Sequence, residues 1–168
     1  ALVSPDTPWE THYVRGVPVH VKREDLSCPY PGPSFSKIRG LAAWIDALPS
    51  DIPVGVLDTL HSKGGWGISY LCQAAGRKCY DFYPVYKADT GLRYNQCQAR
   101  MLGSELVPLQ AGRSSILYHS AKKMLAQFTG GMGVMVPNAL KVEQSVDETA
   151  IEVLDYTPDE YLYGTWVV

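Results

Sequence analysis

The sequence lacks any apolar run that approaches the roughly 20 residues needed to span a membrane. It also lacks a clustered basic segment: its net charge is −2 and its pI is about 6.1. A nucleic-acid interface normally has such a basic cluster, and no secretory leader pattern is found at the start. We therefore expect a cytoplasmic protein with no membrane segment and no nucleic-acid signature.

Cysteine is scarce, and its spacing is uninformative for metals. The four cysteines are Cys28, Cys72, Cys79 and Cys97. They form no C-x-x-C pair and no metal-ligand spacing. We expect reduced thiols and no metal site.

What the sequence does have is an alternation of short apolar runs with amphipathic segments. This pattern is typical of βαβ units and a parallel sheet. Early extended segments are expected within 12–22. The main strands are expected at 52–57, 78–85, 105–109 and 133–136. Helices are expected at about 37–48, from 68 to a cap at Gly76, at 91–102, from a cap at Ser114 to 128, and from a capping box at Ser145 to 154.

The fold class predicted is α/β, a three-layer αβα arrangement with a mostly parallel sheet. We expect residues 1–48 to form the N-terminal strands and a lysine-bearing helix of a large subdomain. Residues 49–140 would form a small subdomain with a four-stranded parallel sheet, and 141–168 a helix and strand that return to the large one. The apolar run 163–168 is expected to be a strand, with the protein continuing beyond Val168.

Lys37 is the first candidate for chemistry. It lies at the start of a predicted helix, behind a loop rich in Pro, Gly and Ser. A lysine at such a junction can react with a bound aldehyde if burial or a neighbouring cation lowers its pKa. Position alone also suits a solvated lysine. Nearby Arg39 suits a structural ion pair better than an anion contact.

The second candidate is the segment Ser62-Lys63-Gly64-Gly65-Trp66-Gly67, between a predicted strand and a predicted helix. Glycines let the backbone approach a ligand, and a helix N-terminus presents free N–H groups. Such a turn can hold a carboxylate or a phosphate. It matches neither G-x-G-x-x-G nor the P-loop pattern, so its signal alone is weak.

Taken in order, several segments resemble the N-terminal portion of the fold-type II pyridoxal-phosphate (PLP) enzymes. This group includes tryptophan synthase β, cysteine synthase, threonine deaminase and the ACC deaminase/D-cysteine desulfhydrase enzymes. Similar motifs are found at Thr7-Pro8-Trp9, Lys22-Arg23-Glu24-Asp25-Leu26, Ser34 to Gly40 (with one residue inserted), Ser62 to Gly67, Ala74 to Cys79, Met101 to Val107, Glu148 to Val153 and Tyr163 to Val168.

The resemblance implies a role for each candidate. Lys37 would be the Schiff-base lysine, and Ser62 to Gly67 would receive the substrate carboxylate. Gly65 stands where the family has an asparagine that contacts the PLP phenolic oxygen, and Trp66 follows it. Lys63 could replace that polar contact or face solvent. In the family, the phosphate loop and the partner of the pyridine nitrogen come after the position of Val168.

The function predicted is a PLP-dependent enzyme, or the N-terminal part of one, that acts on an amino acid or amino-acid-like substrate. Elimination, replacement and deamination all begin from the same Cα carbanion, with Lys37 as general base. A homodimer or a companion chain could complete the fold. One alternative is a non-catalytic descendant that serves as a binding or assembly module. Another is an unrelated flavodoxin-like or Rossmann-like domain.

Overall fold

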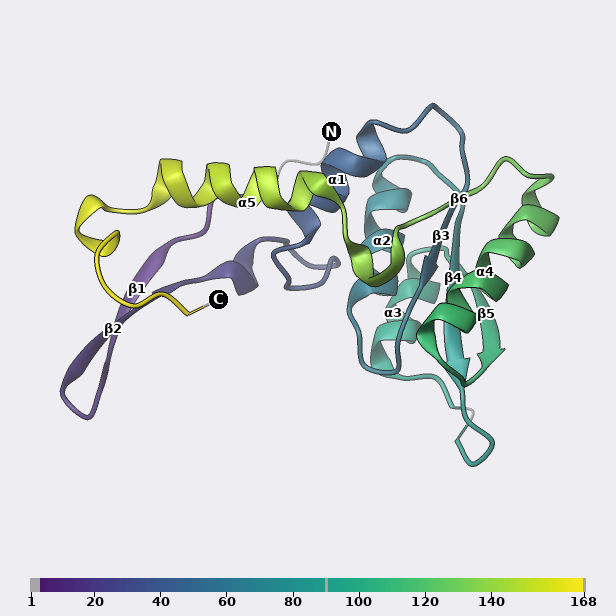
Figure 1. Cartoon of the computed structure of the whole chain (residues 1–168), viewed down its shortest axis with the longest axis horizontal. Coiled ribbons are helices and arrows are strands. Elements are labelled where there is room, and N and C mark those ends of the chain that lie inside the picture. The colour runs from purple at the N-terminus through teal and green to yellow at the C-terminus, as the bar shows by residue number, and fades with distance from the viewer. Residues whose placement is uncertain (1–3, 90, 168) are drawn as a thin grey trace.

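The computed structural model describes residues 4–89 and 91–167. Its central unit is a parallel sheet with helices on both faces (Figure 1). The strands are β3 (Val54–Leu57), β4 (Cys79–Val85), β5 (Glu105–Gln110) and β6 (Val134–Met135), in the spatial order β5-β4-β3-β6. The helices of this unit are α1 (Ile38–Asp46), α2 (Gly64–Ala74), α3 (Tyr94–Met101) and α4 (Ser114–Thr129). The predicted α/β class is confirmed.

Two cores form because alternate side chains of each strand point to opposite faces of the sheet. On one face, Val54 and Val56 pack with Ile38 of α1 and with α2. On the other face, Phe82 packs with Leu125 of α4. The side chains in both sets are almost fully buried. The sheet is therefore covered on both sides, as its continuous apolar strands require.

A second region, which we call the arm, projects from the sheet unit (Figure 1). It consists of β1 (Trp9–Val14), β2 (Val17–Lys22), α5 (Glu143–Tyr156) and the chain that follows α5. β1 and β2 form an antiparallel hairpin, and α5 packs along α1. The Trp9 indole donates a hydrogen bond to the Tyr156 carbonyl at 3.0 Å, which ties the hairpin to the end of α5.

Three local expectations were wrong. The glycines of Ser62–Gly67 do not precede a helix but form the first turn of α2. Ser145 does not cap α5, which begins at Glu143 after Val142, and Ser114 is the first residue of α4, not its cap. These hydroxyls were misplaced because the apolar periodicity fixes a helix face more sharply than it fixes a helix end.

The terminal strand is also absent from the described part of the segment. After a short 3-10 helix, Asp159–Tyr161, residues 162–167 form no strand, and Val168 lies outside the described residues. Tyr163 and Val167 are 87% and 93% exposed. A strand requires a neighbouring strand for its hydrogen bonds, and none of the described strands pairs with this segment.

No helix within residues 4–89 and 91–167 is long and apolar enough to cross a membrane. The four cysteines are free thiols, three of them buried.

Candidate active site

Lys37 lies immediately before α1, at the N-cap position. Its side chain is exposed, and its Nζ donates to the Ala139 carbonyl at 3.4 Å. That carbonyl belongs to the segment that follows β6. No carboxylate of the described residues lies within ion-pair distance of Nζ. The amine is therefore held near the end of a sheet strand and is open to a reactant.

The segment Ser62–Gly67, which we call the glycine turn, follows β3 at the carboxyl end of the sheet. Ligands of open α/β sheets bind at this edge. The Ser62 hydroxyl accepts a hydrogen bond from the Gly64 N–H at 2.9 Å. Within the described ranges, no acceptor pairs with the backbone N–H groups of Lys63 and Trp66. These two donors are thus unpaired within those ranges.

The structure brings the glycine turn against the loop that carries Lys37. Lys63 Nζ donates to the Ser34 carbonyl at 3.0 Å, and the Trp66 indole donates to the Pro31 carbonyl at 2.7 Å. The Phe35 ring lies over Gly67, where an added Cβ would come within 2.7 Å of the ring. The glycine at 67 is therefore what allows the two loops to pack together.

Four of the quoted motifs meet elsewhere, in a buried ionic cluster between the arm and α1. Lys22 Nζ lies 2.8 Å from a Glu152 carboxylate oxygen, and Arg39 pairs with both Glu24 and Glu152. The Thr7 N–H donates to Glu152 at 3.0 Å. Arg39 is therefore a structural ion-pair partner, as expected.

The charge on Glu152 is favoured despite its burial. Burial opposes ionisation, but hydrogen bonds from Lys22 and Thr7 and the charges of Arg39 and Lys22 outweigh it. The pKa of Glu152 therefore lies below its ordinary value.

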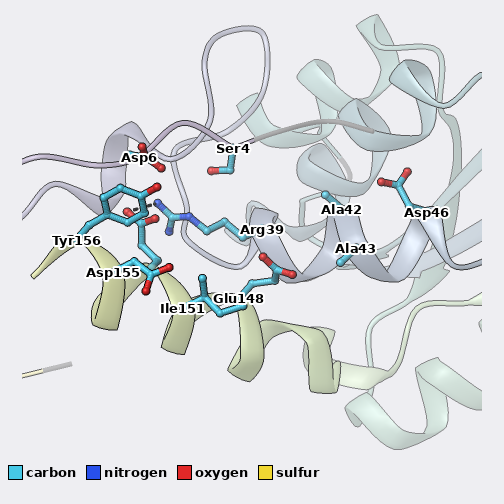
Figure 2. Close-up of a pocket in the computed structure, with 11 residues that line it drawn as sticks. Ser4, Asp6, Arg39, Ala42, Ala43, Asp46, Glu148, Ile151, Asp155 and Tyr156 are labelled. Carbon is cyan, nitrogen blue, oxygen red and sulfur yellow. Dashed lines mark ion pairs between the residues drawn. The ribbon is translucent and has the colours of Figure 1, made fainter.

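A surface pocket of about 310 Å³ lies beside this cluster, between α1 and α5 (Figure 2). Arg39, Asp46, Glu148 and Asp155 are among its lining residues, and Figure 2 shows the Arg39 side chain extending toward Tyr156. Neither Lys37 nor any residue of the glycine turn lines it. The pocket is thus separate from the predicted site.

Four residues that the sequence did not single out lie around the glycine turn: Asp58, Asp81, Asn95 and Gln96. Asp58, which follows β3, and Asp81, within β4, are both buried beneath the turn. Gln96 Nε2 donates to Asp58 at 3.3 Å, and Asn95 Nδ2 donates to the Ser62 carbonyl at 2.8 Å. One sequence signal could have indicated these residues: Asp81 is a charged residue within the otherwise apolar strand β4.

The position of Gly65 differs from what the resemblance implies for its counterpart. A Cβ built on Gly65 would lie 2.5 Å from Asp81 Oδ2 and 2.6 Å from Asp58 Oδ2. The residue thus faces the protein interior. Its assignment as a cofactor contact stays a prediction.

Comparisons with known proteins bear on the fold. No family model matches the chain. A glycyl-dTMP PLP-dependent decarboxylase of Pseudomonas phage M6 is 46% identical over 170 residues, which is 99% of this chain and 60% of the relative. The chain thus spans less than two thirds of that relative's length.

Solved structures share the fold at low sequence identity. An ACC deaminase homologue superposes with a TM-score of 0.75 at 17% identity, over 95% of this chain and 50% of that one. O-ureido-L-serine synthase gives a TM-score of 0.67 at 19% identity, over 91% and 48% of the two chains. A PLP-dependent aspartate racemase gives 0.65 at 23% identity, over 92% and 47%.

The chain therefore has the fold of the N-terminal portion of the fold-type II PLP-dependent enzymes, and the predicted resemblance is confirmed. Within that class, its sequence is similar to the phage decarboxylase along nearly its whole length.

Proposed function

We propose that this chain supplies the lysine-bearing part of a PLP-dependent enzyme that acts on an amino-acid-like substrate. The observation that carries the proposal is the packing of the Lys37 loop against the glycine turn at the carboxyl end of the sheet. The 46% identity to a PLP-dependent decarboxylase supports it and disfavours the non-catalytic alternative.

The residues present supply a lysine that the cofactor could reach. Lys37 is exposed, and its hydrogen-bond partner is a neutral carbonyl. PLP, when bound, would withdraw the electron pair that bond cleavage leaves on the substrate Cα. Lys37 would hold the cofactor and move a proton at Cα.

The glycine turn would bind and orient the substrate carboxylate. The free N–H groups of Lys63 and Trp66 would donate to it, at the positive end of the α2 dipole. Ser62 and Gly64 would shape the turn through their own hydrogen bond, and Gly67 would keep it against the Lys37 loop. The Lys63 ammonium, next to this loop, would add a positive charge.

We propose decarboxylation as the reaction, on a substrate whose amino-acid unit is carried by a thymidine nucleotide. The basis is the activity that the phage relative's name states. The sequence left elimination, replacement and deamination open, and decarboxylation adds a fourth outcome. The bond from Cα to the carboxylate would break, carbon dioxide would leave, and Lys37 Nζ would donate a proton to Cα.

The subdomain division at 48 and 140 and the means of completing the fold are part of the same proposal. The position of the parallel sheet within 54–135 and the packing of α5 on α1 support that division, and α1 packs on the sheet as well. The remaining part of the fold would come from further residues of the same chain, a second copy or a companion chain. Light scattering of the purified protein distinguishes these arrangements. A cytoplasmic location also stays a prediction.

The test uses the protein encoded by the whole open reading frame that contains this sequence. With PLP and synthetic glycyl-dTMP, we expect release of carbon dioxide, and we expect Lys37→Ala to abolish it. Lys122→Ala, at an exposed position of α4, is the matched control and should retain activity. Equal release from Lys37→Ala and the wild type would overturn the proposal.

A further inference from the structure

Two buried aspartates, Asp58 and Asp81, each place one carboxylate oxygen close to Gly65 in the first turn of α2. In the parallel pairing of β3 with β4, Asp81 lies opposite Val56. Asp58 comes two residues after Val56, so both carboxylates point to the face that α2 covers. Asp81 and Asp58 are 0% and 1% exposed.

The residue above this pair, Gly65, has no side chain, and the two carboxylates occupy the space that one would need. Both Oδ2 atoms point at the place where Gly65 would carry a Cβ, at 2.5 and 2.6 Å from it. Real Cβ atoms do not approach oxygen so closely. The glycine at this position of the turn is therefore a packing requirement of the two carboxylates.

The two carboxylates differ in what they accept. Asp58 accepts hydrogen bonds from the Thr59 N–H at 2.9 Å and from Gln96. The Gly65 N–H and the Ser62 hydroxyl also face it. Both oxygens of Asp81 are buried without a partner, and no cation of the described residues pairs with either aspartate. An isolated buried carboxylate charge is strongly disfavoured.

We propose that Asp58 and Asp81 share one proton and act together as positioning residues for the glycine turn. The neutral Asp81 donates to Asp58, as in carboxylate dyads that cannot both ionise. Asp58 keeps its charge and holds the Gly65 N–H and the Ser62 hydroxyl. The N–H groups of Lys63 and Trp66 are then left pointing away from the pair, toward the substrate carboxylate.

The titration of the pair supports this arrangement. Burial raises the pKa of Asp58 to about 6, against the hydrogen bonds that lower it. Burial and the neighbouring Asp58 and Cys79 raise the pKa of Asp81 well above its ordinary value. The other groups near the pair are Gln96 of α3 and Tyr83 of β4. None of these carries a positive charge.

The first test is independent of the proposed function. Infrared spectra of the full protein at neutral pH should contain a carboxylic-acid C=O band in the wild type. Asp81→Asn should remove the band, and Asp46→Asn, on an exposed position of α1, should not. A wild type without the band, or an Asp81→Asn protein that keeps it, would overturn the shared proton.

The second test measures positioning and rests on the proposed function. As the pair loses its shared proton at alkaline pH, a second negative charge beneath the turn should raise the wild-type KM for the carboxylate substrate roughly tenfold. The KM of Asp81→Asn should not rise in that range. A wild-type KM that is flat across the pH at which the infrared band disappears would refute the positioning role.

If the enzyme shows no activity, the infrared band still decides whether the proton is shared. Failure of the proposed function is thereby separated from failure of the pair.

Discussion

The arm and the sheet unit both bury carboxylates, but they stabilise them in opposite ways. In the arm, Glu152 lies against Lys22 and Arg39, and its pKa is lowered. In the sheet unit, Asp58 and Asp81 are buried together beneath Gly65, no described cation pairs with either, and their pKa values are raised. A buried acid can thus be kept by pairing its charge or by keeping its proton. The paired charge of Glu152 joins the arm to α1, and the protonated aspartate pair lies beneath the glycine turn.

The two regions also differ in how they treat apolar side chains. Those of the sheet unit lie in two closed cores. In the arm, Tyr13 and Leu154 are each 74% exposed. Apolar groups that gather on an exposed surface commonly mark an interface. The sheet unit therefore depends on its own contacts, whereas the arm depends on the ionic cluster that ties it to α1.

The largest expected effect comes from breaking that cluster. Glu152→Ala removes the buried carboxylate that Lys22 and Arg39 share and leaves only Glu24 to pair with them, which should lower the free energy of unfolding by about 3–5 kcal/mol. Urea unfolding measures the loss. Asp147→Ala, at an exposed position of the same helix, should change stability by no more than about 0.5 kcal/mol. Equal losses in the two variants would contradict the role of the cluster.

The next effect compares one substitution in the two regions. Leu125 of α4 is 1% exposed, so Leu125→Ala should cost about 2–5 kcal/mol of unfolding free energy. Leu154→Ala in the arm should cost about 0.5 kcal/mol or less, because that side chain is already in water. Thermal or urea unfolding of both variants decides the matter. If Leu154→Ala loses as much stability as Leu125→Ala, the Leu154 side chain is buried in the protein in solution, which would contradict this comparison.

The smallest effect is the change of folding stability with pH, and its sign differs between Asp81 and Glu152. Asp81 has a raised pKa when folded, so the folded protein binds more protons than the unfolded chain and its stability falls as pH rises above about 4. Asp81→Asn should remove this penalty and gain about 1–3 kcal/mol over the wild type at pH 7, but little at pH 4. Unfolding curves at both pH values measure it.

Glu152 has the opposite sign. Its lowered pKa gives stability that is present above the unfolded value of 4.5 and is lost as pH falls through the folded value. An Asp81→Asn gain that is the same at pH 4 and pH 7 would contradict the raised pKa of Asp81.

The sequence was sufficient for the fold class because its apolar runs and helix faces are clean. The strands around Val54, Phe82 and Val107 form where they were expected. The ordered motifs also indicated Lys37 and the glycine turn, and the structure packs the loop that precedes Lys37 against that turn. The terminal strand failed because strand formation depends on a partner that local sequence does not contain.

The proximity of Asp58 and Asp81 could not be predicted from the sequence for a related reason. Asp58 and Asp81 are 23 positions apart, and only the parallel register of β3 and β4 places them under one glycine. Gly65 looked like a missing cofactor contact when the loop was considered alone. Its environment explains it as the space that two carboxylates need.

The central claim is that Lys37 is the residue that holds the cofactor. The most direct measurement treats the full protein with PLP and borohydride and maps the phosphopyridoxyl label by peptide mass spectrometry. We predict label on Lys37, and none on Lys63 of the glycine turn. Label on Lys63, label spread over surface lysines, or no label at all would contradict the account.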